Sequence, residues 1–134
     1  MKQLVYFAHP VTHYNTEMEV KCEKKIRDYI DYAEIFNPNQ EWLQRVYDNR
    51  KKNGHETPFD IFKELAEACD ITIGVAFMDG VLGAGVANEC HRAYAAGKEV
   101  LVLFPSTMEI VGFNTMLPSL SIKETRERIK RKEM

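Results

Sequence analysis

Residues 71–89 read ITIGVAFMDGVLGAGVANE, a short apolar run followed by a glycine-spaced loop. The run 71–77 is apolar and rich in β-branched residues, which is typical of a strand buried in a sheet. Gly83 and Gly85 then lead into a helical pattern that contains Glu89. Open α/β sheets keep their ligands where strands end and helices begin. The sequence therefore predicts that Glu89 is a functional carboxylate, either a nucleophile or a base.

A helical wheel over residues 85–96 supports this prediction. Four residues share one arc that should face the sheet: Val86, Cys90, Ala93 and Gly97. Glu89 falls to one side of this arc, so its carboxylate is expected at the boundary between core and solvent. Its early position in the helix favours the ionised form through the helix dipole. A second interpretation stays open, in which Glu89 is an ordinary first-turn acid or pairs with Arg92.

Three further apolar runs have strand character, at residues 4–8, 33–36 and 100–104. Amphipathic helical stretches alternate with these runs, so we expect one α/β domain over residues 1–134 with a parallel sheet of about four to five strands. Capping boxes predict four helix starts: Thr16 with Glu19, Thr57 with Asp60, Ser106 with Glu109, and Ser121 with Glu124. A further short helix is expected around residues 40–50.

Composition excludes several classes of function. The formal net charge of −2 over 134 residues gives no general attraction to a nucleic acid polymer or to an anionic membrane. The three cysteines form no CxxC pair, which suits reduced thiols in the cytoplasm. The sequence shows no signal peptide or membrane-spanning run. Its four histidines lack the spacing of a zinc site, and no Walker loop or GxGxxG motif is present, so neither a metal nor a cofactor is expected.

Residues 69–104 resemble the core of the nucleoside 2-deoxyribosyltransferase-like superfamily, which includes nucleoside 5′-monophosphate N-glycosidases. The resemblance rests on an acid before the strand, a glycine turn that leads to Glu89, and Gly97-Lys98 before the next strand. The opening segment Val5-Tyr6-Phe7-Ala8-His9-Pro10 is similar to the first strand of that family. The resemblance implies a flavodoxin-like, Rossmann-like fold and cleavage of an N-glycosidic bond.

The resemblance also implies roles for individual residues. Glu89 would attack C1′ of the sugar and form a glycosyl-enzyme intermediate. Tyr6 matches a family tyrosine that positions this glutamate, although it could simply be a core aromatic. Asp79 and Asp60 are the candidates for the acid that assists the departing base. Asp79 could instead be a turn residue and Asp60 the acid of its capping box.

We expect the substrate, a small-molecule nucleoside or nucleotide, to contact two loops. The predicted binding residues are His9, Pro10, His13, Gly83, Gly85, Asn88 and Asn114. His9 replaces a glycine of the family, and the first loop could bind a 5′-phosphate through its histidines and the helix start at Thr16. A plain polar loop around His13 and Tyr14 is the alternative. A homodimer or higher homo-oligomer is expected, with Asn114 either donated across the interface or serving as a turn residue.

Three functions follow from these expectations. The first is hydrolysis of the N-glycosidic bond of a (deoxy)nucleoside 5′-monophosphate or nucleoside. The second is base exchange by a deoxyribosyltransferase, because water and a base compete for the same intermediate. The third is a non-catalytic protein that binds or sequesters nucleotides.

Overall fold

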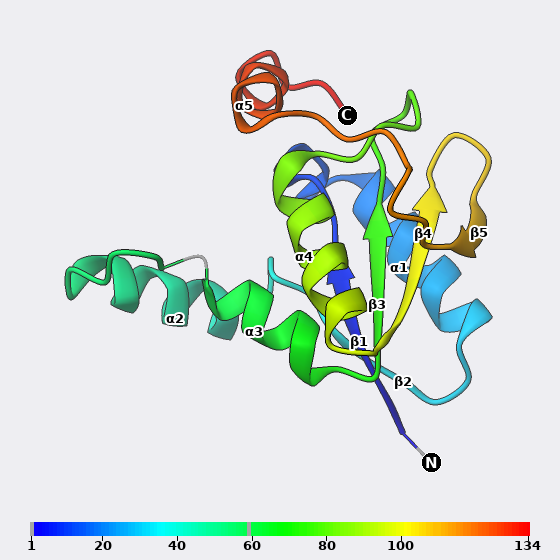
Figure 1. The fold of residues 1–134 in the computed structure, drawn as a ribbon, viewed down its shortest axis with the longest axis horizontal. Helices are drawn as coiled ribbons and strands as arrows, with labels where there is room; N and C mark the ends of the chain where they lie inside the picture. Colours follow the sequence, from blue (N-terminus) through cyan, green and yellow to red (C-terminus); the bar gives the residue numbers. More distant parts are fainter. Residues whose placement is uncertain (1, 59) are drawn as a thin grey trace.

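The computed structural model describes residues 2–58 and 60–134. Within them a five-stranded sheet has helices on both faces (Figure 1). The strands are β1 (Gln3–Ala8), β2 (Ala33–Phe36), β3 (Ile71–Val75), β4 (Glu99–Phe104) and β5 (Glu109–Gly112). The helices are η1 (Val11–His13), a single 3₁₀ turn, followed by α1 (Glu17–Tyr29), α2 (Glu41–Lys52), α3 (Asp60–Ala68), α4 (Ala84–Ala95) and α5 (Ile122–Lys130).

The sheet order is β2-β1-β3-β4-β5, in which the first four strands in the chain are parallel and β5 is antiparallel. This order confirms the predicted α/β class and is a flavodoxin-like, Rossmann-like arrangement. The chain leaves β1 toward one edge of the sheet and returns to pair β3 on the other side of β1. The loops after β1 and β3 therefore diverge at the position where such folds bind ligands.

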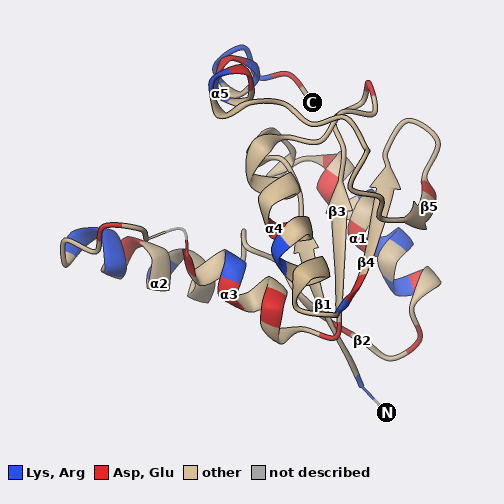
Figure 2. Ribbon diagram, in the orientation of Figure 1, with Lys and Arg blue, Asp and Glu red and all other residues tan. Residues whose placement is uncertain are grey.

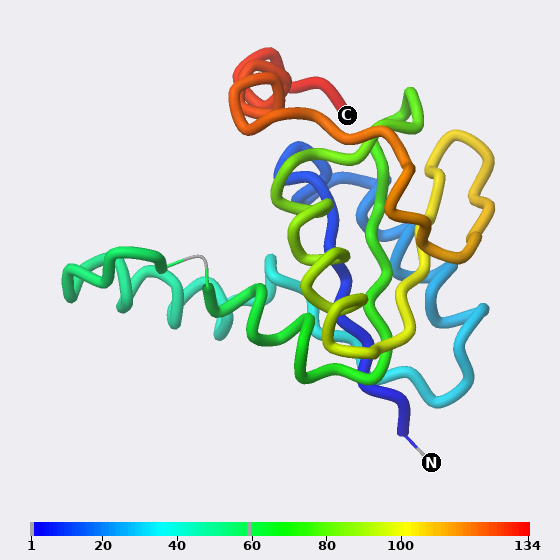
Figure 3. Tube along the Cα trace, in the orientation of Figure 1, coloured from blue at the N-terminus to red at the C-terminus, as the bar shows by residue number. Residues whose placement is uncertain are grey.

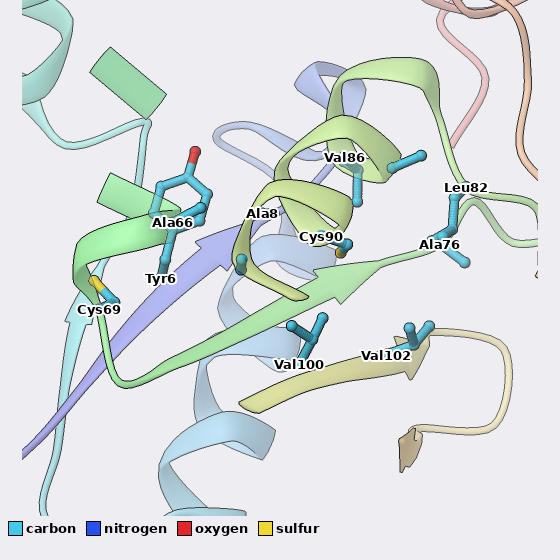
Figure 4. Close-up of a cluster of buried hydrophobic side chains, with 12 residues drawn as sticks. Tyr6, Ala8, Ala66, Cys69, Ala76, Leu82, Val86, Cys90, Val100 and Val102 are labelled. Atoms are coloured by element: carbon cyan, nitrogen blue, oxygen red, sulfur yellow. The ribbon is translucent and has the colours of Figure 1, made fainter. Parts of the chain in front are cut away.

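The two faces of the sheet carry different cores because side chains alternate along each strand. On one face, Val5 and Phe7 of β1 pack with the buried residues of α1. On the other face, Tyr6 and Ala8 pack with residues of α3 and α4 (Figure 4). All three cysteines are free and buried.

Gly74 sets how closely α4 lies on the sheet. A Cβ atom at this position would lie 2.5 Å from Sγ of Cys90 and 3.1 Å from Cγ1 of Val86. Both contacts are shorter than ordinary packing distances, so only glycine lets α4 approach β3 this closely. The wheel prediction is confirmed for Val86, Cys90 and Ala93, which are all buried, and it is wrong for Gly97, which lies beyond the end of α4 and is exposed.

Two of the capping predictions are confirmed at helix starts. Thr16 is the N-cap of α1 and accepts a hydrogen bond from the Glu19 amide at 3.3 Å. Ser121 and Glu124 form a complete capping box at α5. The helix expected around residues 40–50 is α2. At α3, the Thr57 hydroxyl donates to the Asp60 side chain, and residue 59 between them lies outside the described residues.

The helix predicted to start at Ser106 is wrong. Residues 105–108 form a turn, and Glu109 begins β5, which pairs with β4 in an antiparallel register. Met108 has a φ of 60°, a left-handed conformation that turns the chain back on itself. The open edge of β4 offers main-chain partners for four residues of β5, and this ladder outweighs a helix cap of about 1 kcal/mol.

The chain after β5 crosses the carboxyl ends of the strands before it forms α5 (Figure 3). Leu82 and Ser119 form a parallel bridge, and the amide of Leu120 donates to the carbonyl of Leu82 at 2.8 Å. None of the residues of α5 is buried, and most of the helix is made of charged residues, coloured blue and red in Figure 2. Within the described residues, no helix is both long enough and apolar enough to cross a membrane.

Candidate active site

Glu89 of α4 is bound by a tyrosine from β1. The Tyr6 hydroxyl donates to Oε1 of Glu89 at 2.8 Å and lies 3.3 Å from Oε2. The Tyr6 ring is fully buried, and Figure 4 shows its hydroxyl oxygen at the outer edge of the cluster. This contact follows from strand alternation, which points Tyr6 toward α4, and from Gly74, which brings α4 close. The structure thus brings together two of the four predicted catalytic residues.

The electrostatics of Glu89 are set mainly by its burial. The side chain is half-buried, and desolvation raises its pKa to about 7, although the Tyr6 hydrogen bond and the charge of Lys63 act in the opposite direction. Burial raises the pKa of Tyr6 well above its ordinary value, and the charge of Glu89 raises it further. Tyr6 therefore stays a neutral donor. A carboxyl group that titrates near neutral pH can serve as a nucleophile, a base or an acid.

Tyr14 was not among the predicted site residues, but it lies close enough to Glu89 to feel its charge. Burial raises the pKa of Tyr14 well above its ordinary value, and the charges of Glu89 and Glu19 add to the rise. Its ring lies 4.8 Å from the His9 ring, measured between centroids. A tyrosine one loop beyond Tyr6 could have been suspected, because the loop after β1 and the start of α4 meet at the same edge of the sheet.

His9 is an internal support of the loop after β1. Its side chain is fully buried, and its ring stacks on Phe7 at 3.9 Å. Nδ1 lies 3.0 Å from the carbonyl oxygen of Phe7, and Nε2 lies 2.7 Å from a carboxylate oxygen of Glu19. Glu19 also accepts hydrogen bonds from the Asn15 amide and the Asn39 side chain. Both ring nitrogens of His9 are therefore engaged within the protein, and neither is directed at a ligand.

The rest of this loop is also buried. His13 is inaccessible to solvent, and its Nε2 lies 3.1 Å from the carbonyl oxygen of Met134. Among the described residues, no hydrogen-bond partner is found for Nδ1 of His13 or for the buried hydroxyl of Thr12. Burial lowers the pKa of His13, so the ring is neutral at pH 7 and offers no positive charge to a phosphate. Pro10 is buried as the N-cap of η1.

Neither of the two predicted acids, Asp79 and Asp60, is hydrogen-bonded to Tyr6 or Glu89 among the contacts of the described residues; each is bonded to another partner. Asp79, in the turn after β3, accepts two hydrogen bonds from Arg128 of α5 at 2.9 and 2.6 Å. Asp60 accepts a hydrogen bond from the Thr57 hydroxyl at 2.6 Å. These hydrogen bonds are the main reason that the pKa of each acid is below its ordinary value. Both are ionised at neutral pH, so neither can donate a proton in this arrangement.

The glycine turn at the start of α4 is partly covered by α5. Gly83 is the N-cap of α4 and is buried against Phe77 and Thr125. It has no side chain to cap the helix, and the Thr125 hydroxyl instead accepts the hydrogen bond of the Ala84 amide at 2.9 Å. Gly85 faces open space. The helix start is therefore completed by a segment far along the chain.

The remaining predicted binding residues are exposed. Asn88 lies on the solvent side of α4. Asn114 is also exposed, and its side-chain oxygen accepts a hydrogen bond from the Met116 amide at 2.8 Å, as expected of a turn asparagine. Two surface hollows, one along α5 and one beside β2, are lined by residues other than Glu89. Within the described residues, no three metal-binding side chains are grouped around a common point.

Fold and site together define a Rossmann-like α/β protein with a half-buried glutamate held by a tyrosine of the first strand. In comparisons with known proteins, neither a family model nor a curated sequence matches this chain.

Proposed function

We propose that this protein hydrolyses the N-glycosidic bond of a (deoxy)nucleoside 5′-monophosphate or nucleoside, with Glu89 as the nucleophile. The observation that supports this proposal best is the hydrogen bond from Tyr6 to Glu89 at 2.8 Å. The sequence resemblance implies the same pairing of a first-strand tyrosine with a glutamate of a later helix. A raised pKa and half-burial beside the first strand of the sheet also suit a reactive carboxylate.

The proposed reaction has two steps. In the first, a Glu89 oxygen bonds to C1′ while the C1′–N bond breaks and its electron pair leaves with the nucleobase. In the second, water attacks C1′, the bond between C1′ and the Glu89 oxygen breaks, the carboxylate is regenerated, and the proton lost by the water passes to solvent. Tyr6 is closer to Oε1 than to Oε2. Its bond would orient the carboxylate and leave Oε2 the freer oxygen for attack.

The departing base needs a proton, and the two predicted acids are a poor source in this arrangement. Asp79 would first have to lose its ion pair with Arg128. Asp60 would have to lose the hydrogen bond from Thr57. This lack of a ready acid favours one competing function, a protein that binds nucleotides without turnover. Base exchange remains the other competitor, since it uses the same intermediate with a second base in place of water.

A panel of nucleosides and nucleoside monophosphates, incubated with the purified protein, distinguishes these functions. Hydrolysis releases free base, exchange transfers sugar to an added base, and sequestration gives tight binding without product. Glu89→Ala should abolish release, whereas Glu99→Ala, at an exposed position on β4, should retain it. A 2′-fluoro nucleoside, which slows breakdown of the intermediate, should leave a sugar adduct on Glu89 detectable by peptide mass spectrometry. Normal turnover by Glu89→Ala would refute the nucleophile assignment.

The proposal extends to assembly and location. We expect a homodimer or higher homo-oligomer in the cytoplasm, in which Asn114 of the partner subunit approaches the site around Glu89. Support comes from the sequence resemblance, since that family commonly completes its active site with residues from a neighbouring subunit, and from the exposure of Asn114. Light scattering that showed only monomers would remove the shared site.

A further inference from the structure

The helices α3 and α4 lie side by side and run in the same direction. The helix α3 precedes β3 in the chain and α4 follows it, and the strands on either side of each connection, β2, β3 and β4, are parallel. Each helix therefore runs back toward the amino-terminal edge of the sheet, as Figure 1 shows. Their shared face contributes Ala66 of α3 and Val86, Cys90 and Ala93 of α4 to one buried cluster.

An ion pair fixes how the polar edges of these helices face each other. Arg92 of α4 donates a hydrogen bond to Glu67 of α3. Residues three or four positions apart lie on the same face of a helix. On α3, Lys63 lies one turn before Glu67. On α4, Glu89 lies one turn before Arg92. Because the helices are parallel, the same step on each brings Lys63 opposite Glu89.

The titratable groups near Glu89 are neutral or paired elsewhere, except Lys63, whose positive charge acts on the Glu89 carboxylate. Tyr6 of β1 and Tyr14 of the loop after β1 both have raised pKa values and stay neutral. On α4 itself, the thiol of Cys90 is neutral because burial raises its pKa to about 12, and Arg92 is engaged by Glu67. From α3, the charge of Lys63 lowers the pKa of Glu89 against the effect of burial.

We propose that Lys63 is a positioning residue whose ammonium group favours the charged form of the Glu89 carboxylate. Its Nζ lies 3.9 Å from Oδ1 of Asp60, one turn away on α3, and its charge also acts on Glu89 of α4. The side chain is about a third exposed, which lets it respond when a ligand excludes water from the site. Charges attract more strongly when water is removed, and Lys63 would then offset the added desolvation of Glu89. The link to attack on C1′ rests on the proposed function, whereas the charge relation does not.

The test is a direct titration that needs no turnover. The side-chain carboxyl carbons of ¹³C-labelled glutamates are followed by NMR from pH 4 to pH 9, and Glu89→Gln identifies the Glu89 signal. The midpoint, about 7 in the wild type, should move to higher pH in Lys63→Met. Lys63→Arg should restore it. Lys24→Met, on α1 and the opposite face of the sheet, should leave it unchanged.

An unchanged midpoint in folded Lys63→Met would overturn the proposal. So would an equal movement in Lys24→Met, because the effect would then be one of total charge. Lys63→Gln provides a second neutral variant if the methionine protein does not fold. If the protein is a glycosidase, kcat/KM below the midpoint should fall about threefold for each half pH unit that the midpoint rises. Absence of turnover in the wild type would refute the proposed hydrolysis and leave the titration result standing.

Discussion

Glu89→Gln should make the protein more stable at neutral and alkaline pH while abolishing its proposed activity. The amide keeps the volume of the side chain and keeps an oxygen that can accept the Tyr6 hydrogen bond. It removes the charge whose desolvation raises the pKa of Glu89 from 4.5 to about 7. A residue that is costly to the fold and needed for chemistry is expected at an active site.

The size of the gain follows from this pKa difference. The native state holds the Glu89 proton more tightly than the unfolded state does, so the neutral carboxyl contributes stability that is fully present below pH 4.5 and is lost as pH rises through 7. At 1.4 kcal/mol per pH unit, the loss is about 3 kcal/mol. Glutamine does not titrate, so the variant should gain this amount relative to the wild type between pH 4.5 and pH 8.

Urea unfolding followed by circular dichroism at several values between pH 5 and pH 8.5 measures this difference. Glu99→Gln is the matched control, since it removes an exposed carboxylate at the start of β4 and should change little at any pH. The stability difference between Glu89→Gln and the wild type should grow with pH and level off above neutrality. A constant difference, or a variant less stable than the wild type at pH 8, would refute the reasoning.

Three further substitutions test neighbouring features. Tyr6→Phe removes a hydrogen bond to a charged acceptor, worth about 1.5–3 kcal/mol; the pKa of Glu89 should rise, and any kcat/KM at pH 7 should fall about 10- to 100-fold in a steady-state assay. Gly74→Ala places a methyl group against α4 and should cost about 1–3 kcal/mol in urea unfolding. Arg128→Met frees Asp79, so hydrogen exchange in α5 should accelerate while the free energy of unfolding falls by less than about 1 kcal/mol; unchanged exchange would show that α5 is held by other contacts.

The central strands were predictable because strands that are buried on both faces consist of continuous apolar runs. Residues 4–8, 71–77 and 100–104 became β1, β3 and β4 with small changes at their ends. β5 was missed because it is a four-residue edge strand whose side chains are mostly exposed. Its pattern lacks an apolar run, and its pairing partner, not its own composition, determines its conformation.

The site was predictable only in part. The helical wheel placed Glu89 at the boundary between core and solvent, and the family resemblance supplied Tyr6 as its partner; the structure shows the hydrogen bond between them. Lys63 could not be found in this way, because its relation to Glu89 depends on how two helices pack. The Arg128–Asp79 pair spans 49 positions, and a contact at that separation leaves no local signal.

The capping of α4 by Thr125 has a consequence for the order in which the protein is built. The hydrogen bond from the Ala84 amide to Thr125 spans 41 positions, so Thr125 leaves the ribosome only after β1, β3 and β4 have left it. The first turn of the helix that carries Glu89 is therefore finished late. A nascent chain can thus begin to bury its core before the first turn of α4 has its cap, which is supplied only when α5 docks.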